Sequence, residues 1–414
     1  MRRFPIYRWS STRDRFAPAT PDSRSPSMAA GARPSDILPD ASGPRPVVVV
    51  TGALAPYTHV LYEGLAERLA GRDGRALHVL SCTPRERARQ WVMPPPRLYR
   101  HAVLPGLRWH RSSIRNLYVN PAVVPRLAAL RPAALVLNDF SPTMLFARGA
   151  ARLRRIPTLV RTDGVPETDP GQRSAPHRWL RRAIVSGAAA GIGPSAGSGA
   201  VLARYGLPPE RFVLSPLFPA WTPPAPPPPD SARPYDLLFC GMLNEEVKGA
   251  RFFTEVVLGC RDRGRPLSVR VAGDGPLRAE MEARFAQAGL SARFDGFLGQ
   301  EALPEVYASA RLFLFPSRGD VWGIVVQEAL QSGTPVLASP HSGAARGLLE
   351  AHGCGAVRPM VVADWVAAAL RLLDDGSLRE DLRRAAERVL PHFTAEAAVA
   401  GYLAALEPLL HGRP

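Results

Sequence analysis

Short apolar segments alternate with amphipathic segments along most of the chain, and this alternation constrains the fold more than any other feature. Such apolar segments are typical of strands buried on both faces of a parallel sheet, and the segments between them have the periodicity of helices. In the first half of the chain they span residues 47–50, 76–81, 133–139, 156–162 and 191–195. The pattern predicts an α/β fold with a doubly wound parallel sheet.

A proline-dense segment, residues 218–234, interrupts the pattern, which restarts at residue 235. Because proline cannot donate a backbone hydrogen bond within a sheet and keeps the chain extended, this segment is expected to contain a linker. Two α/β units predict two Rossmann-like domains facing an interdomain cleft, with ligands at the carboxyl ends of the strands. The predicted division is a disordered extension (1–44, with Met28 as an alternative start), an N-terminal domain (45–222), a linker (223–234), a C-terminal domain (235–395) and a terminal helix (396–414).

The net charge is +16, which is typical of proteins that bind nucleic acid or an anionic membrane surface. Lys248 is the only lysine of the sequence, so a coding preference for arginine explains part of the arginine content. The charge is unevenly distributed, however: residues 47–222 carry +15 and residues 223–414 carry −3. A coding preference alone would enrich both halves, so the asymmetry favours an anionic partner for the first domain.

The four cysteines lie far apart and lack the spacing of a metal site, which indicates a reducing compartment. No apolar segment reaches the roughly 18 residues that span a bilayer, and no secretory signal is recognisable. We therefore expect a cytoplasmic protein whose membrane contact, if it has one, is peripheral.

The segment 312–331 combines a strand, a loop and a helix that begins near Gly323. Free amides at the start of such a helix can bind phosphate oxygens. Asp320 in the loop and Glu328 in the helix can each accept two hydrogen bonds from a vicinal diol of a sugar. The alternative is that Asp320 caps the helix and Glu328 is a solvated acid.

A second candidate is the segment 240–253, in which Gly241 follows a strand and Lys248 precedes a helix. An ammonium at a helix start can act as a point charge on a diphosphate. A lysine in such a segment is ordinarily a surface residue without a function. Because every other basic residue of this kind in the chain is an arginine, however, the single lysine favours a specific role.

Together these motifs resemble those of the retaining glycosyltransferases of family 4, also called group 1 glycosyltransferases, which have the GT-B fold. The order and spacing agree over about 100 residues, in segments 241–243, 248–249, 273–276, 294–296, 316–317, 320–329 and 333–336. The first domain is similar only in segments 51–57 and 159–168. The resemblance implies transfer of a sugar, with retention of configuration, from a UDP-, GDP- or ADP-sugar, with no cofactor and no metal.

The resemblance also implies roles for individual residues of the second domain. Glu328 would bind the ribose and Asp320 the transferred sugar, while Lys248, Gly241 and the amides of Trp322, Gly323 and Ile324 would hold the diphosphate. Two positions depart from the family pattern. Asp320 stands where glutamate is commoner, and Met242 replaces a phosphate-binding arginine for which Arg251 or Arg318 is expected to substitute.

In the first domain, many relatives carry a histidine where this chain has Asp163. We expect Asp163 to orient the acceptor hydroxyl or the sugar, so that Asp163, Asp320 and Lys248 are the predicted catalytic residues. Asn138 and Asp139, which end the preceding strand, are further candidates for acceptor contact.

Three segments of the first domain mix arginine with tryptophan, a combination suited to a membrane interface or to a lipid-linked diphosphate. The contact residues predicted from them are Trp109, Trp179, Arg181 and Arg182. A solvated arginine-rich surface is the alternative.

The sequence thus predicts a glycosyltransferase that uses a nucleotide sugar and an acceptor that is lipid-linked or otherwise membrane-associated. The alternatives are the same reaction on a soluble small molecule, a sugar-nucleotide epimerase, and a basic nucleic-acid-binding protein. No nucleic-acid-binding motif supports the last of these.

Overall fold

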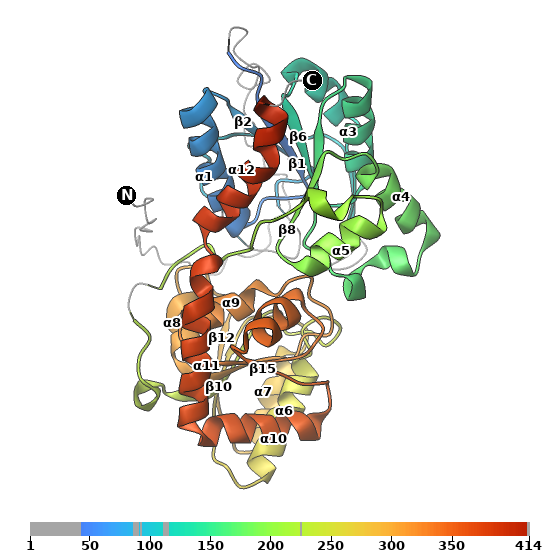
Figure 1. The fold of residues 1–414 in the computed structure, drawn as a ribbon. Coiled ribbons are helices and arrows are strands. Elements are labelled where there is room, and N and C mark those ends of the chain that lie inside the picture. The colour runs from blue at the N-terminus through green and yellow to red at the C-terminus, as the bar shows by residue number, and fades with distance from the viewer. Residues whose placement is uncertain (1–42, 86–90, 92, 111–115, 224–225, 412–414) are drawn as a thin grey trace, which may run out of the picture.

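The computed structural model describes residues 43–85, 91, 93–110, 116–223 and 226–411. The predicted extension at 1–44, including Met28, therefore lies almost wholly outside the described residues. Two α/β domains follow one another along the chain, each with its own large sheet (Figure 1).

The sheet of the N-terminal domain has seven parallel strands in the order β3-β2-β1-β6-β7-β8-β9. The strands are β1 (Val47–Thr51), β2 (Leu77–Ser81), β3 (Arg100–Val103), β6 (Ala134–Asn138), β7 (Thr158–Arg161), β8 (Ala190–Gly193) and β9 (Phe212–Leu214). The helices are α1 (Pro56–Asp73), α2 (Val123–Leu130), α3 (Pro142–Leu153), α4 (Ala175–Val185) and α5 (Ala196–Arg204). The predicted parallel, doubly wound arrangement is confirmed.

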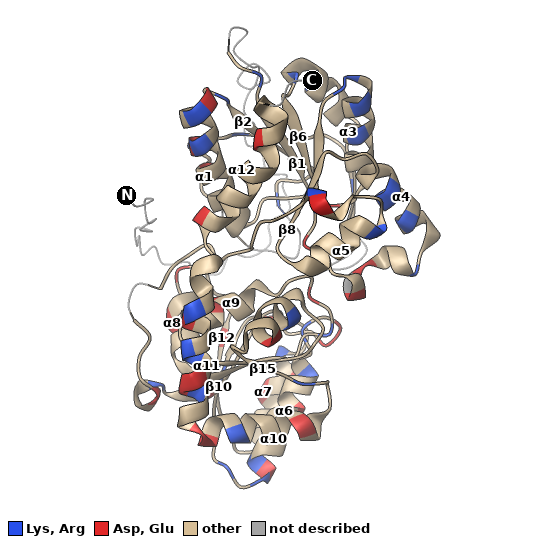
Figure 2. Ribbon diagram, in the orientation of Figure 1, with Lys and Arg blue, Asp and Glu red and all other residues tan. Residues whose placement is uncertain are grey.

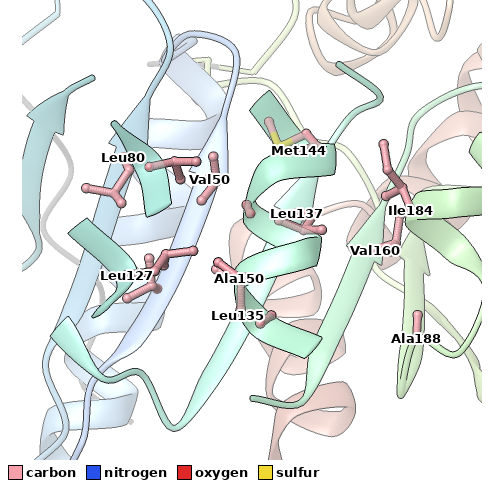
Figure 3. Close-up of a cluster of buried hydrophobic side chains, with 14 of the residues drawn as sticks. Val50, Leu80, Leu127, Leu135, Leu137, Met144, Ala150, Val160, Ile184 and Ala188 are labelled. Carbon is pink, nitrogen blue, oxygen red and sulfur yellow. The ribbon is translucent and has the colours of Figure 1, made fainter. Parts of the chain in front are cut away.

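Side chains of β1 alternate between the two faces of this sheet, as the period of a strand requires. Val48 and Val50 pack in the cluster that contains residues of α2, α3 and α4, part of which Figure 3 shows. Val47 and Val49 belong to a second cluster, which contains residues of α1 and of the C-terminal helix. Both faces of the sheet are therefore covered, which explains why β1 is apolar throughout.

Three features of this domain had no counterpart in the predicted strands. Strand β3 contains Arg100 and His101, and β9 has only three residues, so neither has the apolar pattern of a buried strand. The third is an antiparallel hairpin of β4 (Leu107–His110) and β5 (Asn116–Val119), which forms a separate two-stranded sheet.

The C-terminal domain has a six-stranded parallel sheet in the order β12-β11-β10-β13-β14-β15. Its strands are β10 (Tyr235–Cys240), β11 (Ser268–Ala272), β12 (Ser291–Gly296), β13 (Ala310–Phe315), β14 (Val336–Ala338) and β15 (Ala356–Val357). Its helices are α6 (Ala250–Asp262), α7 (Arg278–Gln287), α8 (Leu303–Ala308), α9 (Ile324–Gln331), a π-helix (Ala345–Glu350), α10 (Val362–Asp374) and α11 (Gly376–Val389). Phe313 and Leu314 pack into clusters on opposite faces, so helices cover this sheet on both sides as well.

The described end of the proline-rich segment is bound to the C-terminal domain. The buried guanidinium of Arg233 donates to the backbone oxygens of Ala310 (2.8 Å) and Gly333 (3.0 Å). Asp230 forms ion pairs with Arg379 and Arg383 of α11. This end of the segment is therefore a fixed part of the second domain rather than a free spacer.

The chain returns to the N-terminal domain through α12 (Ala395–His411), which lies beside α1 in Figure 1. Its Val399, Tyr402 and Leu406 are buried in the same cluster as Val47 and Val49 of β1. The last helix thus completes the core of the first domain, so the two domains are joined by two crossings of the chain.

Among the described residues, no single helix is long and apolar enough to cross a membrane. One bent pair, Gly376–His392 with Ala395–His411, meets the criterion by length and composition alone. The buried residues of α12 pack against the N-terminal sheet, which accounts for its apolar composition.

Truncating Leu406 tests the contribution of α12 to the first domain. Leu406 is fully buried, so Leu406→Ala removes apolar contacts and leaves a cavity. We expect the free energy of unfolding to fall by about 3 kcal/mol, measured by urea denaturation followed by circular dichroism. The control is Ala404→Ser at an exposed position of the same helix, and equal stability of the two variants would contradict this role of α12.

Candidate functional site

Close backbone approach brings together the loops that follow β10, β11 and β13. Gly249 has a φ of 67°, and a Cβ there would overlap the carbonyl oxygen of Pro316 at the end of β13. Gly273 has a φ of 141°, and a Cβ there would overlap the carbonyl oxygen of Gly241. Glycine is therefore required at both positions, because it adopts these conformations without strain and leaves room for the neighbouring loop.

Lys248 and Asp320, both predicted as site residues, form an ion pair between two of these loops. The Lys248 ammonium also lies over the ring of Phe315, 5.6 Å from its centroid. The backbone holds the arrangement, because the amide of Arg318 donates to the carbonyl of Val247 at 2.8 Å. The side chains of Lys248 and Asp320 are 15% and 24% exposed, so both charges remain accessible to a ligand.

Gly323 is the N-cap of α9, at the helix start that the sequence predicted. The Trp322 ring is buried, stacks on Phe393 and donates a 2.9 Å hydrogen bond to Gln327. The side chain of Trp322 is thus used in packing, and the role predicted for Trp322 concerns its backbone amide alone. Because Gln327 in turn donates to the carbonyl of Leu217 (2.8 Å), α9 is also tied to the segment that follows β9.

Glu328 is buried on α9 and accepts a 2.8 Å hydrogen bond from the Tyr307 hydroxyl. It is therefore not the solvated helix acid of the alternative interpretation. Cys240, which ends β10, lies beside this pair, since Tyr307 and Glu328 both influence its pKa. Burial raises the pKa of the Cys240 thiol to about 12, so the group is neutral at physiological pH.

The two arginines expected to substitute at Met242 both have acidic partners. Arg318 forms an ion pair with Glu245 at 2.5 Å. Arg251 forms a bidentate contact with Glu280 on α7, with separations of 2.9 Å. The backbone amide of Arg318 bonds to the carbonyl of Val247, in the loop that carries Lys248.

In the N-terminal domain, a chain of polar contacts joins the carboxyl ends of three adjacent strands, β1, β6 and β7. Asn138 donates to the Thr51 hydroxyl at 3.0 Å and accepts from Arg161 at 2.9 Å. Arg161 forms an ion pair with Asp163 at 2.6 Å. The structure thus links the predicted residues Asn138 and Asp163 through Arg161, which the sequence analysis did not select.

The Arg161 side chain is only 4% exposed, while that of Asp163 is 19% exposed. Burial alone lowers the pKa of the guanidinium, but the charge of Asp163 and neighbouring tyrosines raise it above its usual value. The buried cation therefore holds one carboxylate at the edge of the sheet. Asp139, in contrast, is exposed and has a φ of 93°, an uncommon conformation that aspartate tolerates better than most residues.

Contacts between the domains lie next to these residues. Glu167, four residues after Asp163, forms a 2.6 Å ion pair with Arg346 of the π-helix in the second domain. Tyr57, in the first turn of α1, packs against core clusters of both domains. The loop that carries Asp163 and the start of α1 are thus on the side of the first domain that meets the second.

Of the four residues predicted from the Arg/Trp segments to contact a membrane or acceptor, the structure exposes three and buries one. Trp109, Trp179 and Arg182 are exposed, in β4 and α4. Arg181 is not: its side chain is 10% exposed, pairs with Asp169 at 2.7 Å and lies over the ring of Phe140. The prediction of a surface contact for Arg181 is therefore wrong, because it faces inward on the helix.

In the described residues, no group of three or more His, Cys, Asp or Glu side chains has the arrangement of a metal site. Among the predicted catalytic residues, Lys248 and Asp320 form one ion pair, and Asp163 forms another with Arg161.

Residues 234–375 match the family described as "Glycosyl transferases group 1". The chain carries a group 1 glycosyltransferase domain. This domain begins just before β10 and ends after α10, so it contains Lys248, Asp320 and Glu328.

Curated relatives are similar over about two fifths of the chain. One is the 2-deoxystreptamine glucosyltransferase of Streptomyces kanamyceticus, 34% identical over 171 residues, which are 40% of this chain and 44% of the relative. Another is the GDP-mannose-dependent alpha-(1-6)-phosphatidylinositol dimannoside mannosyltransferase of Mycobacterium tuberculosis, 32% identical over 172 residues, 41% of this chain and 43% of the relative. The chain thus spans less than half the length of these relatives.

Solved structures are similar over nearly the whole fold. Anabaena HepE in complex with UDP and glucose superimposes with a TM-score of 0.65 at 14% identity, over 87% of this chain and 99% of that structure. The apo lipopolysaccharide outer core galactosyltransferase WaaB has a TM-score of 0.63 at 12% identity, with the same coverage. The fold is GT-B, with two Rossmann-like domains.

Removing the carboxylate of Asp163 tests the buried ion pair. Asp163→Ala leaves the Arg161 guanidinium without its charged partner in a buried position. We expect a loss of about 3 kcal/mol in the free energy of unfolding, at the low end for a broken buried pair because Arg161 keeps its bond to Asn138. Glu67→Ala, at an exposed position of α1, is the control, and urea denaturation curves that coincide for the two variants would refute the prediction.

The cysteine thiols provide a test of burial across both domains. Burial raises the pKa of Cys82, Cys260 and Cys354 to about 11 and that of Cys240 to about 12. A raised thiol pKa reduces the reactive thiolate fraction at pH 8, so iodoacetamide should label the native protein far more slowly than the urea-unfolded protein. Rapid labelling of any of the four native thiols, identified by peptide mass spectrometry, would contradict this expectation.

Proposed function

We propose that this protein is a retaining glycosyltransferase of family 4 that transfers a sugar from a nucleotide-diphosphate sugar to an acceptor. The observation that carries the proposal is the pairing of Lys248 with Asp320 immediately before the start of α9, with Glu328 buried further along that helix. Asp320, the amides at the start of α9 and Glu328 follow one another along the chain, as the sugar, the diphosphate and the ribose follow one another in the donor. Lys248 adds a cation beside Asp320.

In this proposal the donor replaces the internal ion pair. Lys248 turns to the diphosphate, whose oxygens also accept from the backbone amides of Trp322, Gly323 and Ile324. Asp320 is released to accept hydrogen bonds from hydroxyls of the transferred sugar. Glu328, held by Tyr307, accepts from the ribose hydroxyls.

The same groups act during transfer by stabilising the leaving group. Negative charge grows on the diphosphate as the bond to the sugar breaks, and in this proposal Lys248 and the helix amides neutralise that charge. Because these groups supply the positive charge, the proposed reaction uses no metal ion. The loops that carry Lys248 and Asp320 are joined at the carbonyl of Val247, which accepts from the backbone amide of Arg318 and from the hydroxyl of Ser317.

The acceptor is proposed to bind against the N-terminal domain, with Asp163 orienting its hydroxyl and Asn138 and Asp139 near it. We propose a lipid-linked or other membrane-associated acceptor for a protein bound at the cytoplasmic side of a membrane, and no nucleic-acid partner. One relative is named as a phosphatidylinositol dimannoside mannosyltransferase, which supports this class of acceptor. Another relative is named as a 2-deoxystreptamine glucosyltransferase, so a soluble small acceptor is the second candidate.

Replacing Lys248 tests the donor site. Lys248→Ala removes the cation from the leaving group, so hydrolysis or transfer of a nucleotide sugar should slow by about 100-fold or more. The donor is chosen from UDP-, GDP- and ADP-sugars by the nucleoside diphosphate that raises the melting temperature of the wild type most. Glu328→Gln should reduce that shift in melting temperature, because a neutral amide holds the ribose less strongly.

Arg261→Ala is the matched control, since Arg261 is a cation in the last turn of α6, away from Lys248, and pairs with Asp262. Its turnover should remain near that of the wild type. Undiminished turnover in Lys248→Ala would rule out the proposed donor site.

A further inference from the structure

The hairpin of β4 and β5 presents an apolar face to solvent. In its register, Leu107 lies opposite Val119 and Trp109 opposite Leu117, so these four side chains share one face. Leu107 is 73% exposed, Trp109 72% and Leu117 45%. Large apolar side chains that gather in this way on a protein surface mark sites of interaction with a partner.

The opposite face of the hairpin fixes its orientation. Tyr118 is buried in the core cluster beneath the hairpin, and its carbonyl accepts from the Thr143 hydroxyl at 3.0 Å. The guanidinium of Arg108 donates to the carbonyl of Cys82 at 3.2 Å. The base is held by Asn120, whose side chain donates to the carbonyl of Leu104 at 2.9 Å. The apolar face is thus held outward by packing and hydrogen bonds.

A groove of about 320 Å³ lies where the hairpin joins the domain. Its walls come from the segment that leads into β4 and from the segment that follows β5 together with α2. The lining is apolar except for one arginine, and includes Val103, Pro105, Ala122, Pro125, Ala129 and Arg126. A groove of this size and character suits part of a hydrocarbon chain.

The segment of sequence around the hairpin contains basic residues and no acidic ones. Residues 97–131 contain seven arginines and no aspartate or glutamate. Arg111 and Arg115 lie outside the described residues. Arg108 donates to Cys82 from the opposite face of the hairpin, and the described arginines outside the hairpin are Arg97, Arg100, Arg126 and Arg131. Burial and the charges of Arg100 and Arg126 lower the pKa of His78 to about 4, so each of these arginines lies near His78.

We propose that the β4–β5 hairpin and the groove at its base dock the protein on anionic membrane lipids. Tryptophan and leucine would enter the interface, a lipid chain would occupy the groove, and the arginines would meet the phosphates. Exposed leucines distinguish this surface from a nucleic-acid site, where aromatic rings stack on bases and aliphatic side chains add little. The inference deepens the proposed function, because it names the surface through which a transferase with a membrane-associated acceptor would reach it.

The test is flotation of the wild type and its variants with vesicles of phosphatidylcholine alone or mixed with phosphatidylglycerol, at physiological salt. The wild type should float with the anionic vesicles only. Leu107→Ser combined with Trp109→Ser should weaken binding by about tenfold or more, given the apolar area that would leave water. Arg100→Gln and Arg126→Gln should each weaken it by about fivefold, the factor for one basic residue near such a surface.

Leu153→Ser is the matched control, because Leu153 is 85% exposed but lies at the end of α3, away from the hairpin in sequence. It should float as the wild type does. The hairpin variant should keep the melting temperature and the donor hydrolysis of the wild type, which excludes unfolding as the cause of lost binding.

Two results would overturn the proposal. One is equal flotation of the wild type and the Leu107→Ser/Trp109→Ser variant. The other is a dimer without lipid that this variant converts to a monomer in gel filtration, since the hairpin would then contact a second copy of the chain. Lys248→Ala separates the two proposals: it should lose donor hydrolysis and keep vesicle binding, so each can fail without the other.

Discussion

Parallel pairing of the strands in both large sheets is the constraint on which the rest of the structure depends. Parallel strands need a crossover after each one, and the crossovers bury both faces of the sheet beneath helices. All carboxyl ends then lie along one edge. Gly249 and Gly273 let the loops at that edge approach closely enough for Lys248 to reach Asp320, and in the other domain the same geometry brings Asn138 beside Arg161.

Each edge holds a charged pair, but the two pairs differ in what surrounds them. Arg161 is almost fully buried among polar partners and tyrosines, so its ion pair with Asp163 has a structural component that does not depend on any ligand. Lys248 and Asp320 are more accessible and come from loops whose backbones are independently fixed. An ion pair of the second kind can open for a charged substrate without loss of the fold, and it is the one we assign to the donor.

Several elements were predictable because local pattern and tertiary environment agree. Strand β1 is a run of valines because both of its faces are buried, and the start of α9 is marked by Gly323, which has a positive φ. Strand β3 and the β4–β5 hairpin were missed because their arginine, histidine and tryptophan side chains do not follow the burial pattern of a core strand. Arg181 was misassigned since sequence alone does not tell which side of a short amphipathic helix faces Asp169.

The sequence by itself determined the two α/β units, the uneven charge and the motif spacing that resembles the group 1 glycosyltransferases, since each depends on residues close together in the chain. Only the tertiary structure decided that Lys248 pairs with Asp320, that Arg161 links Asn138 to Asp163, and that α12 completes the first domain. These contacts join residues far apart in sequence. They depend on strand order and on helix orientation, which hydrophobic periodicity does not specify.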